Sequence, residues 1–215
     1  ALPFMRDTIE LARTVGVAAV HFEPVSLTGR CAANKVKTPD PESFAASFLE
    51  CFLLGLKHDI EVSYSGMRCF DHYHNQFCSA CGENICLTPD GYITTCYEVL
   101  ESSDPASSIF FVGRVDKKKN KVVIDESKVN FLKGRITENM NACRDCFLRH
   151  SCAGDCLAKT FRSSGGDIFT PDPHRCRIAE LVNKELIAWL ADGVIEPRVS
   201  LSRLGGRSLR RRHRR

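Results

Sequence analysis

The sequence predicts a mixed α/β protein, with a short α/β unit followed by an irregular, cysteine-rich region that carries β-hairpins and a last helix. Two observations support this fold class. Helical and strand-like patterns alternate up to residue 67, as they do in parallel α/β sheets. Beyond Gly66 the chain becomes polar, aromatic and irregular, and most of its 12 cysteines lie there.

The first unit alternates two helices with two strands. Residues 3–15 read as a helix that the following glycine ends, and residues 17–25 are apolar and β-branched, as in a strand. Asp40-Pro41 predicts the start of a second helix, because aspartate caps a helix and proline suits its first position. Residues 60–65 predict a second strand. Two strands cannot close a barrel, so we expect the truncated edge of a larger (β/α) domain.

Two β-hairpins are expected in the cysteine-rich region. Residues 85–88 and 92–96 flank Pro89-Asp90-Gly91, a turn in which glycine can take the positive φ that such turns need. Residues 110–115 and 122–124 flank a lysine-rich turn and predict the second hairpin.

Helical patterns lie on either side of the densest group of cysteines. Residues 127–138 predict a helix before it, and residues 178–190 predict an amphipathic helix that ends near Gly193. We therefore expect three parts along the chain, which are the truncated α/β unit at 1–67, the cysteine-rich domain at 68–196 and a basic, disordered tail at 197–215.

Composition is that of a globular protein. The 215 residues are 43% hydrophobic and 26% charged, and no apolar run reaches the ~18 residues of a membrane helix. No secretory leader opens the chain, so the cytoplasm is the expected location. The chain begins at Ala1 rather than methionine, which suggests a fragment or a processed product.

The net charge of +4 depends on six arginines in the last nine residues, without which the chain carries about −2. We expect a solvated tail, and attraction to nucleic acid or to a membrane surface is the alternative. Because the body of the chain is not basic, neither nucleic acid nor a membrane is an expected partner.

Four cysteines gather between Cys143 and Cys156, separated by two, five and three residues. Thiolates are ligands of zinc and of iron–sulfur clusters, and both accept a Cys-x2-Cys knuckle such as Cys143 and Cys146. With Cys176 downstream and four cysteines at residues 78–96, the thiols suffice for two four-thiolate sites. Disulfides are less expected in a chain of this length without a leader. Spacing alone leaves iron–sulfur and zinc open.

The order of these cysteines is a more specific signal. The matching features are Cys81-x9-Gly91-x4-Cys96, Cys143-x2-Cys146-x5-Cys152-x3-Cys156 and Cys176, with Pro89-Asp90-Gly91 and Val112-Gly113-Arg114 between them. On these features, residues 68–180 resemble the SPASM domain of radical S-adenosylmethionine (radical SAM) peptide and protein maturases. The resemblance implies that the preceding unit is the C-terminal edge of a partial radical SAM barrel.

The resemblance also implies two auxiliary [4Fe–4S] clusters with interleaved ligands, which would cross-link a domain poor in regular structure. Carried over by position, the first cluster would bind to Cys81, Cys96, Cys156 and one more upstream thiol, and the second to Cys143, Cys146, Cys152 and Cys176.

The fourth ligand of the first cluster is open among three cysteines. Cys78 is favoured because it is nearest to the motif, and Cys69 is a further candidate. Cys86 lies in a hairpin strand, where a cysteine that acts as a small hydrophobe is the alternative. Cys31 and Cys51 are expected to be structural, since Cys51 falls on the apolar face of its helix.

The motif that binds the SAM-cleaving cluster, Cys-x3-Cys-x2-Cys, is absent from the sequence. The chain alone is therefore expected to be inactive, and we favour a missing N-terminal half over a degenerate remnant. In the full-length enzyme, SAM and a third [4Fe–4S] cluster would generate a radical that abstracts hydrogen from a peptide or protein substrate, with an electron donor such as flavodoxin or ferredoxin. The auxiliary clusters would relay electrons or position the substrate. The alternatives are a zinc-stabilised binding module and a stand-alone iron–sulfur electron carrier.

Four polar residues are further candidates. Glu23 closes the first strand, where α/β sheets place ligand residues, so it is a candidate cofactor contact, with a salt-bridged strand end as the alternative. His150 is expected to tune a cluster by hydrogen bonding, whereas His74 is expected in an exposed loop. Asp155, between two predicted ligands, is a candidate acid or base.

Overall fold

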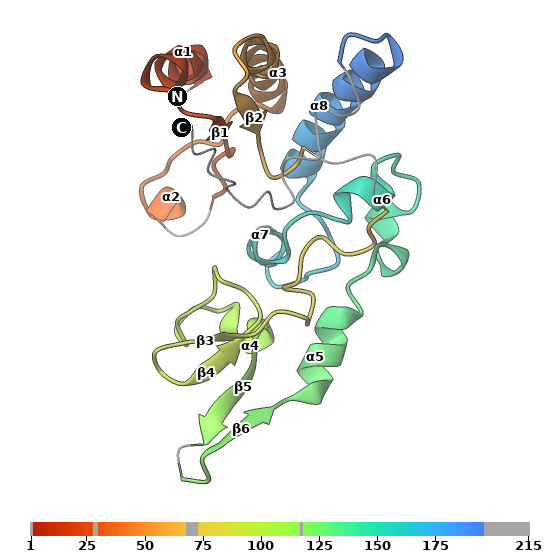
Figure 1. The fold of residues 1–215 in the computed structure, drawn as a ribbon. Coiled ribbons are helices and arrows are strands. Elements are labelled where there is room, and N and C mark those ends of the chain that lie inside the picture. Colours follow the sequence, from red (N-terminus) through yellow and green to blue (C-terminus); the bar gives the residue numbers. More distant parts are fainter. Residues whose placement is uncertain (1, 28–29, 68–72, 117, 196–215) are drawn as a thin grey trace, which may run out of the picture.

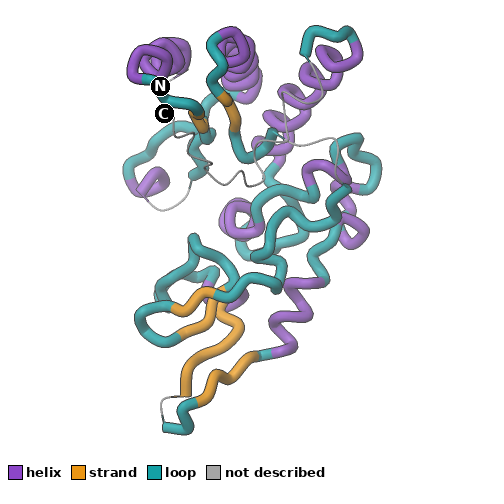
Figure 2. The backbone as a smooth tube through the Cα atoms, in the orientation of Figure 1, coloured by secondary structure: helices purple, strands orange, loops and turns teal. Residues whose placement is uncertain are grey.

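The structure, a computed structural model, describes residues 2–27, 30–67, 73–116 and 118–195. It confirms a mixed α/β fold with a small parallel sheet, a small antiparallel sheet and a long C-terminal helix (Figures 1 and 2). The strands in these ranges close no barrel. None of the helices described there combines the length and the apolar character needed to cross a bilayer.

The secondary structure changes from an alternation of helices and strands to hairpins and short helices, as predicted. In chain order the helices and strands are α1 (Met5–Val15), β1 (Ala19–His21), α2 (Arg30–Ala33), α3 (Pro41–Lys57), β2 (Glu61–Ser63), β3 (Cys86–Leu87), β4 (Tyr92–Thr94), α4 (Ser107–Phe110), β5 (Phe111–Asp116), β6 (Lys121–Ile124), α5 (Glu126–Lys133), α6 (Arg149–Cys152), α7 (Leu157–Ser163) and α8 (Pro173–Ala191).

Helix ends in the first unit follow the sequence signals closely. Gly16 ends α1 in the left-handed conformation, and Asp40 caps α3 by accepting a hydrogen bond from the Ser43 backbone N–H at 2.9 Å. The strand predicted at 17–25 is shorter than expected. The Val17 N–H donates to Ala12 in the cap of α1, and only the three residues of β1 pair with β2.

The parallel pair of β1 and β2 lies in a first hydrophobic core with α1, α3 and α8. Phe48 of α3 is completely buried, and its ring meets that of Tyr64 edge to face at 4.9 Å. Trp189 of α8 stacks on Phe52 of α3 with the ring centroids 6.3 Å apart. Although α8 follows the cysteine-rich region, its apolar face packs on the α/β unit. Figure 1 shows α8 running from beside α3 to the loops near α6 and α7.

The two predicted hairpins form a single antiparallel sheet in the order β3-β4-β5-β6, because β4 also pairs with β5. Gly91 in the first turn has φ 84°, as the sequence predicts. This sheet contributes to a second hydrophobic core, whose fully buried members include Val99, Phe110, Leu132, Ala158 and Ile168.

The helix predicted at residues 127–138 ends early. α5 is capped by Asp125, ends at Lys133 and is followed by Gly134. After it, the Arg135 side chain turns into the interior and hydrogen bonds to carbonyl groups more than fifteen residues away. Gly134 caps the helix at its C-terminal end, and the partners of Arg135 beyond it cannot be read from the local sequence.

Candidate metal centres

The loop that joins Cys152 to Cys156 has an unusual backbone. Its three intervening residues, Ala153, Gly154 and Asp155, all have positive φ, at 51°, 79° and 64°. A Cβ atom at Gly154 would lie 2.6 Å from the buried Met140 side chain, so this position requires glycine. The backbone turns sharply here, and the two flanking cysteines take different neighbours.

Cys152 belongs to what we call the second thiol group. Its members line one cavity of about 330 Å³ although they come from three segments of the chain. One is at the end of a 3-10 turn at 141–143, another ends α6, and a third lies in the first turn of α8. The group consists of Cys143, Cys146, Cys152 and Cys176.

Electrostatics in this group indicate that its thiols lie close to one another. Burial, followed by the negative charge of Cys152, Asp155, Cys143 and Cys146, raises the pKa of Cys176 to about 12. Burial, followed by the charge of Cys146, likewise raises the pKa of Cys143. The thiols of Cys143 and Cys176 would hold their protons at neutral pH without a metal, so metal binding would release protons.

Cys156 belongs to the first thiol group, Cys78, Cys81, Cys96 and Cys156. Burial, together with the charges of Cys156, Glu98 and Cys78, raises the pKa of Cys96 to about 11, against a backbone hydrogen bond from Glu98 that lowers it. Cys81 is completely buried, and its backbone N–H donates to the Cys78 carbonyl at 3.1 Å. Cys96 thus lies within electrostatic reach of Cys156 and Cys78, and Cys78 is hydrogen bonded to Cys81 through the backbone.

The described residues contain no group of three or more His, Cys, Asp or Glu side chains arranged to hold a single metal ion. Zinc needs thiolates about 2.3 Å from the ion, which places their sulfur atoms about 4 Å apart. In the second thiol group the cysteines instead surround a cavity. A multi-atom cluster fits such a cysteine-lined space better than one ion does, so the residues present are compatible with the predicted clusters.

Three of the remaining cysteines lie in other elements of the described chain. Cys86 is in the edge strand β3, where its thiol is 3.9 Å from the neighbouring Leu87 carbonyl. Cys51 is buried in the first hydrophobic core, where burial raises its pKa to about 11, as expected for a structural cysteine. Cys31 is half-buried in α2. Cys69 lies outside the described residues.

Arg135 lies between the two thiol groups and was not singled out by the sequence. It has no exposed surface, and it donates from Nε to the Ile168 carbonyl at 2.7 Å and from Nη2 to the Gly154 carbonyl at 2.6 Å. Burial lowers its pKa, whereas the charges of Cys81, Asp155, Cys143 and Cys156 raise it. An arginine at the end of a predicted helix is normally solvent-exposed, so nothing in the local sequence distinguishes it.

Glu23 belongs to a charged network, in agreement with the salt-bridged alternative for this strand end. Its carboxylate accepts hydrogen bonds from Lys159 at 2.5 Å and from the Ser65 hydroxyl at 2.8 Å, and it pairs with Arg175 at 3.2 Å. Burial opposes ionisation of Glu23, but these partners outweigh it and lower its pKa to about 2. A cofactor contact at Glu23 stays a prediction.

Asp155 is the other anionic member of this network. Arg175 is 5% exposed and holds Asp155 through two of its nitrogens. Burial lowers the pKa of Arg175, but the hydrogen bond and charge of Asp155, followed by those of Glu23, raise it overall. Since the carboxylate is engaged in this pair, the structure does not favour Asp155 as an acid or base.

The two predicted histidine positions lie near the second thiol group. The His74 backbone N–H donates to the His150 carbonyl at 2.7 Å, and the His150 ring stacks on Tyr73 with centroids 4.1 Å apart. His74 is exposed, as predicted. The buried Nδ1 of His150 has no hydrogen-bond partner among the described residues, so its predicted role in tuning a cluster stays a prediction.

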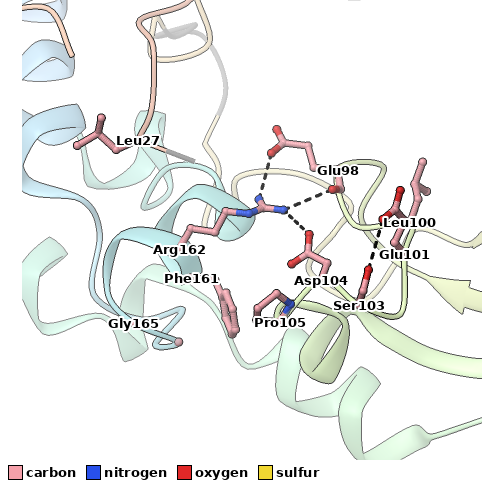
Figure 3. A pocket seen from close by; sticks show the side chains of 11 residues that line it. Leu27, Glu98, Leu100, Glu101, Ser103, Asp104, Pro105, Phe161, Arg162 and Gly165 are labelled. Carbon is pink, nitrogen blue, oxygen red and sulfur yellow. Dashed lines mark hydrogen bonds and ion pairs between the residues drawn. The ribbon is translucent and has the colours of Figure 1, made fainter. Parts of the chain in front are cut away.

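A pocket of about 950 Å³ is lined by Glu98, which follows Cys96 by two residues, and by Arg162 (Figure 3). Arg162 spans it and pairs with Asp104 at 2.8 Å and with Glu98 at 3.4 Å. The charge of Glu98 also contributes to the raised pKa values of Cys96 and Cys156, after burial. A molecule bound in this pocket would therefore lie close to the first thiol group.

No protein-family model matches the sequence, and the search of curated proteins finds no match.

Proposed function

We propose that this chain is the auxiliary iron–sulfur portion of a radical SAM enzyme that modifies a ribosomally made peptide or protein. The observation that supports it most strongly is the spatial grouping of the cysteines. Cys143, Cys146, Cys152 and Cys176 line one cavity, and they are the four residues that the resemblance to the SPASM domain assigns to one cluster.

The first thiol group supports the same proposal. Cys156 follows Cys152 by four residues in the sequence, but its charge raises the pKa of Cys96 in the first thiol group. Interleaved ligands would be arranged in this way. The charge of Cys78 also acts on Cys96, whereas Cys86 lies in the edge strand β3. We therefore assign Cys78, with Cys81, Cys96 and Cys156, to the first cluster.

A buried positive charge near both thiol groups suits the binding of anionic clusters. Each cluster would be bound by four thiolates, which together carry more negative charge than the iron–sulfur core neutralises. Arg135 provides buried positive charge near Cys81, Cys143 and Cys156. A tetrahedral zinc site in the second thiol group would need the cysteines to close on one ion, and they enclose a cavity instead.

In this proposal the described residues bind and orient, and the chemistry of electron transfer belongs to the clusters when they are bound. The thiols hold the clusters, and the charged network of Glu23, Asp155 and Arg175 keeps the cysteine-rich region against the α/β unit. The pocket beside Glu98 and Arg162 is a position at which a substrate would lie near the first thiol group. SAM cleavage would require a Cys-x3-Cys-x2-Cys segment from the rest of the enzyme.

Iron and sulfide analysis tests the proposal directly. The 215-residue chain, purified and reconstituted without oxygen, is expected to be brown and to carry about eight iron and eight sulfide ions, as two [4Fe–4S] clusters require. A colourless protein with one or two zinc ions would contradict the proposal and favour a zinc-stabilised binding module.

Two substitutions test the interleaved assignment. Cys146→Ala should remove about half of the iron by abolishing the second cluster, and Cys156→Ala should remove the other half. The double variant should then bind almost none. If the double variant keeps as much iron as either single variant, both cysteines serve one cluster and the assignment is wrong.

The reading frame upstream of Ala1 distinguishes an enzyme fragment from an electron carrier. An in-frame Cys-x3-Cys-x2-Cys codon pattern would supply the missing SAM cluster. A stop codon or an unrelated domain at that position would favour a stand-alone electron carrier.

A further inference from the structure

Arg135 is the most deeply buried charged side chain among the described residues. The arginine guanidinium stays protonated, and therefore positively charged, inside proteins. It donates three hydrogen bonds, to the carbonyl oxygens of Ala153, Gly154 and Ile168. These acceptors are uncharged. Within the described part of the chain, no carboxylate forms an ion pair or a hydrogen bond with Arg135.

A buried charge without an opposite charge carries a large desolvation penalty. Arg175 is also buried, but its ion pairs with Asp155 and Glu23 offset the cost of removing its charge from water. The contrast indicates that a further negative group compensates Arg135, beyond Asp155 and Asp167, whose charges act on it without a hydrogen bond to the guanidinium.

The position of Arg135 identifies that group. The carbonyls of Ala153 and Gly154 lie in the loop that runs from Cys152, in the second thiol group, to Cys156, in the first. When a bound centre ionises the cysteines, thiolate charge from both groups would act on the guanidinium, through Cys81 and Cys156 on one side and Cys143 on the other. Asp155 also contributes, but it is held by Arg175.

We propose that Arg135 is a positioning residue that serves as the shared counter-ion of the two thiolate-bound centres and holds the loop that separates them. This inference rests on the proposed function, because it takes both centres to be iron–sulfur clusters. A [4Fe–4S] cluster with four thiolates is anionic and gains a further negative charge on reduction. A fixed positive charge between two such clusters stabilises the reduced form of each, since net charge is one of the factors that set their potentials.

The test compares three variants of the 215-residue chain reconstituted with iron and sulfide. Arg135→Gln removes the charge but keeps a hydrogen-bond donor for the loop carbonyls, and Arg135→Lys keeps the charge. Arg144→Gln removes an exposed arginine next to Cys143 and is the matched control. Reduction potentials are measured by anaerobic redox titration with optical and electron paramagnetic resonance detection.

Arg135→Gln is expected to shift both potentials to more negative values, and Arg135→Lys should keep them close to those of the unchanged protein. Arg144→Gln should leave both unchanged, because water and salt screen its charge. Unchanged potentials in Arg135→Gln would overturn the proposal, as would an equal shift in Arg144→Gln. A shift confined to one cluster would refute the shared role.

If Arg135→Gln does not bind iron and sulfide, its potentials cannot be measured, and the iron content of the variants is compared instead. Loading by Arg135→Lys but not by Arg135→Gln would support a requirement for the charge. Failure of both variants would show that the geometry of the guanidinium, rather than its charge, is what matters, and would overturn the proposal. The iron content of the unchanged protein is read first. If that protein binds no iron, the proposed function fails and this inference fails with it, whereas loaded clusters with unshifted potentials refute only the inference.

Discussion

Arg175 donates two hydrogen bonds to Asp155, from Nε to Oδ2 at 2.5 Å and from Nη2 to Oδ1 at 3.2 Å. The same guanidinium reaches Glu23, two residues after β1, at 3.2 Å. Arg175 precedes Cys176 and Asp155 precedes Cys156. One buried arginine therefore joins the α/β unit to the loop between the two thiol groups.

Replacing Arg175 by methionine should destabilise the protein by about 3 kcal/mol. Methionine keeps the apolar part of the side chain but leaves the buried carboxylate of Asp155 without its partner. An unpaired buried charge lowers the free energy of unfolding by several kcal/mol, typically about 3–5. Urea denaturation of the metal-free chain measures the effect. Arg177→Met is the control two residues away, where an exposed pair with Glu42 should contribute far less to the free energy of unfolding, because water and salt screen it. Equal losses in both variants would contradict the buried network.

Glu23 should give the protein an acid-dependent component of stability. Its pKa is lowered to about 2 in the folded protein from 4.5, so its ionised form stabilises the fold above pH 4.5 and loses that effect as the pH falls towards 2. Glu23→Gln should therefore cost about 1–2 kcal/mol at pH 7, allowing for solvent screening, and progressively less below pH 4.5. Unfolding free energies measured between pH 7 and pH 2.5 test this. A constant difference across that range would show that the charge of Glu23 is not involved.

Two serine substitutions should separate the candidates for the fourth ligand of the first cluster. Cys78→Ser should lose about four of the eight expected iron ions, because Cys78 lies close enough to influence Cys96. Cys86→Ser should keep all of them, because Cys86 lies in the edge strand β3. Iron and sulfide content after anaerobic reconstitution is the measurement. The opposite result would place Cys86 in the first cluster.

The loop between the two thiol groups should be sensitive to a single methyl group. Gly154→Ala places a Cβ at φ 79° and 2.6 Å from the buried Met140 side chain, and we expect a loss of about 2–3 kcal/mol. Gly165→Ala is the control, because Gly165 has a similar φ of 73° but open space around it, and it should lose about 1 kcal/mol. Thermal denaturation compares the two, and similar losses would show that backbone conformation alone decides the effect.

Local sequence signals predicted several elements well, because their causes are local. The start of α3 depends on Asp40, whose side chain caps the helix, and on Pro41, whose ring suits the first helical position. Both effects act within a few residues. The glycine in the first hairpin turn has the positive φ that its place between two strands requires. The alternation of helices and strands likewise predicted the parallel pairing of β1 with β2.

Other features depend on contacts that no local pattern contains. The sequence predicted a helix through residue 138, but Arg135 leaves α5 to bind carbonyls of the 153–154 loop and of Ile168. The final helix looked like part of the cysteine-rich region, yet its apolar face packs on α3. In both cases the partner is distant in the sequence, and its position is known only once the chain has folded.

The sequence by itself determined the fold class, the positions of most strands and helix starts, and a cysteine order that predicts two metal centres. The tertiary structure decided which thiols lie together and added the two buried arginines around them. The physical reason is that propensities, caps and turns act within one turn of the chain, whereas burial and the pairing of charges depend on residues brought together from distant segments. Cys152 and Cys156 lie four residues apart in the sequence, and only the three left-handed residues between them, held by Arg135 and Arg175, direct them to different groups.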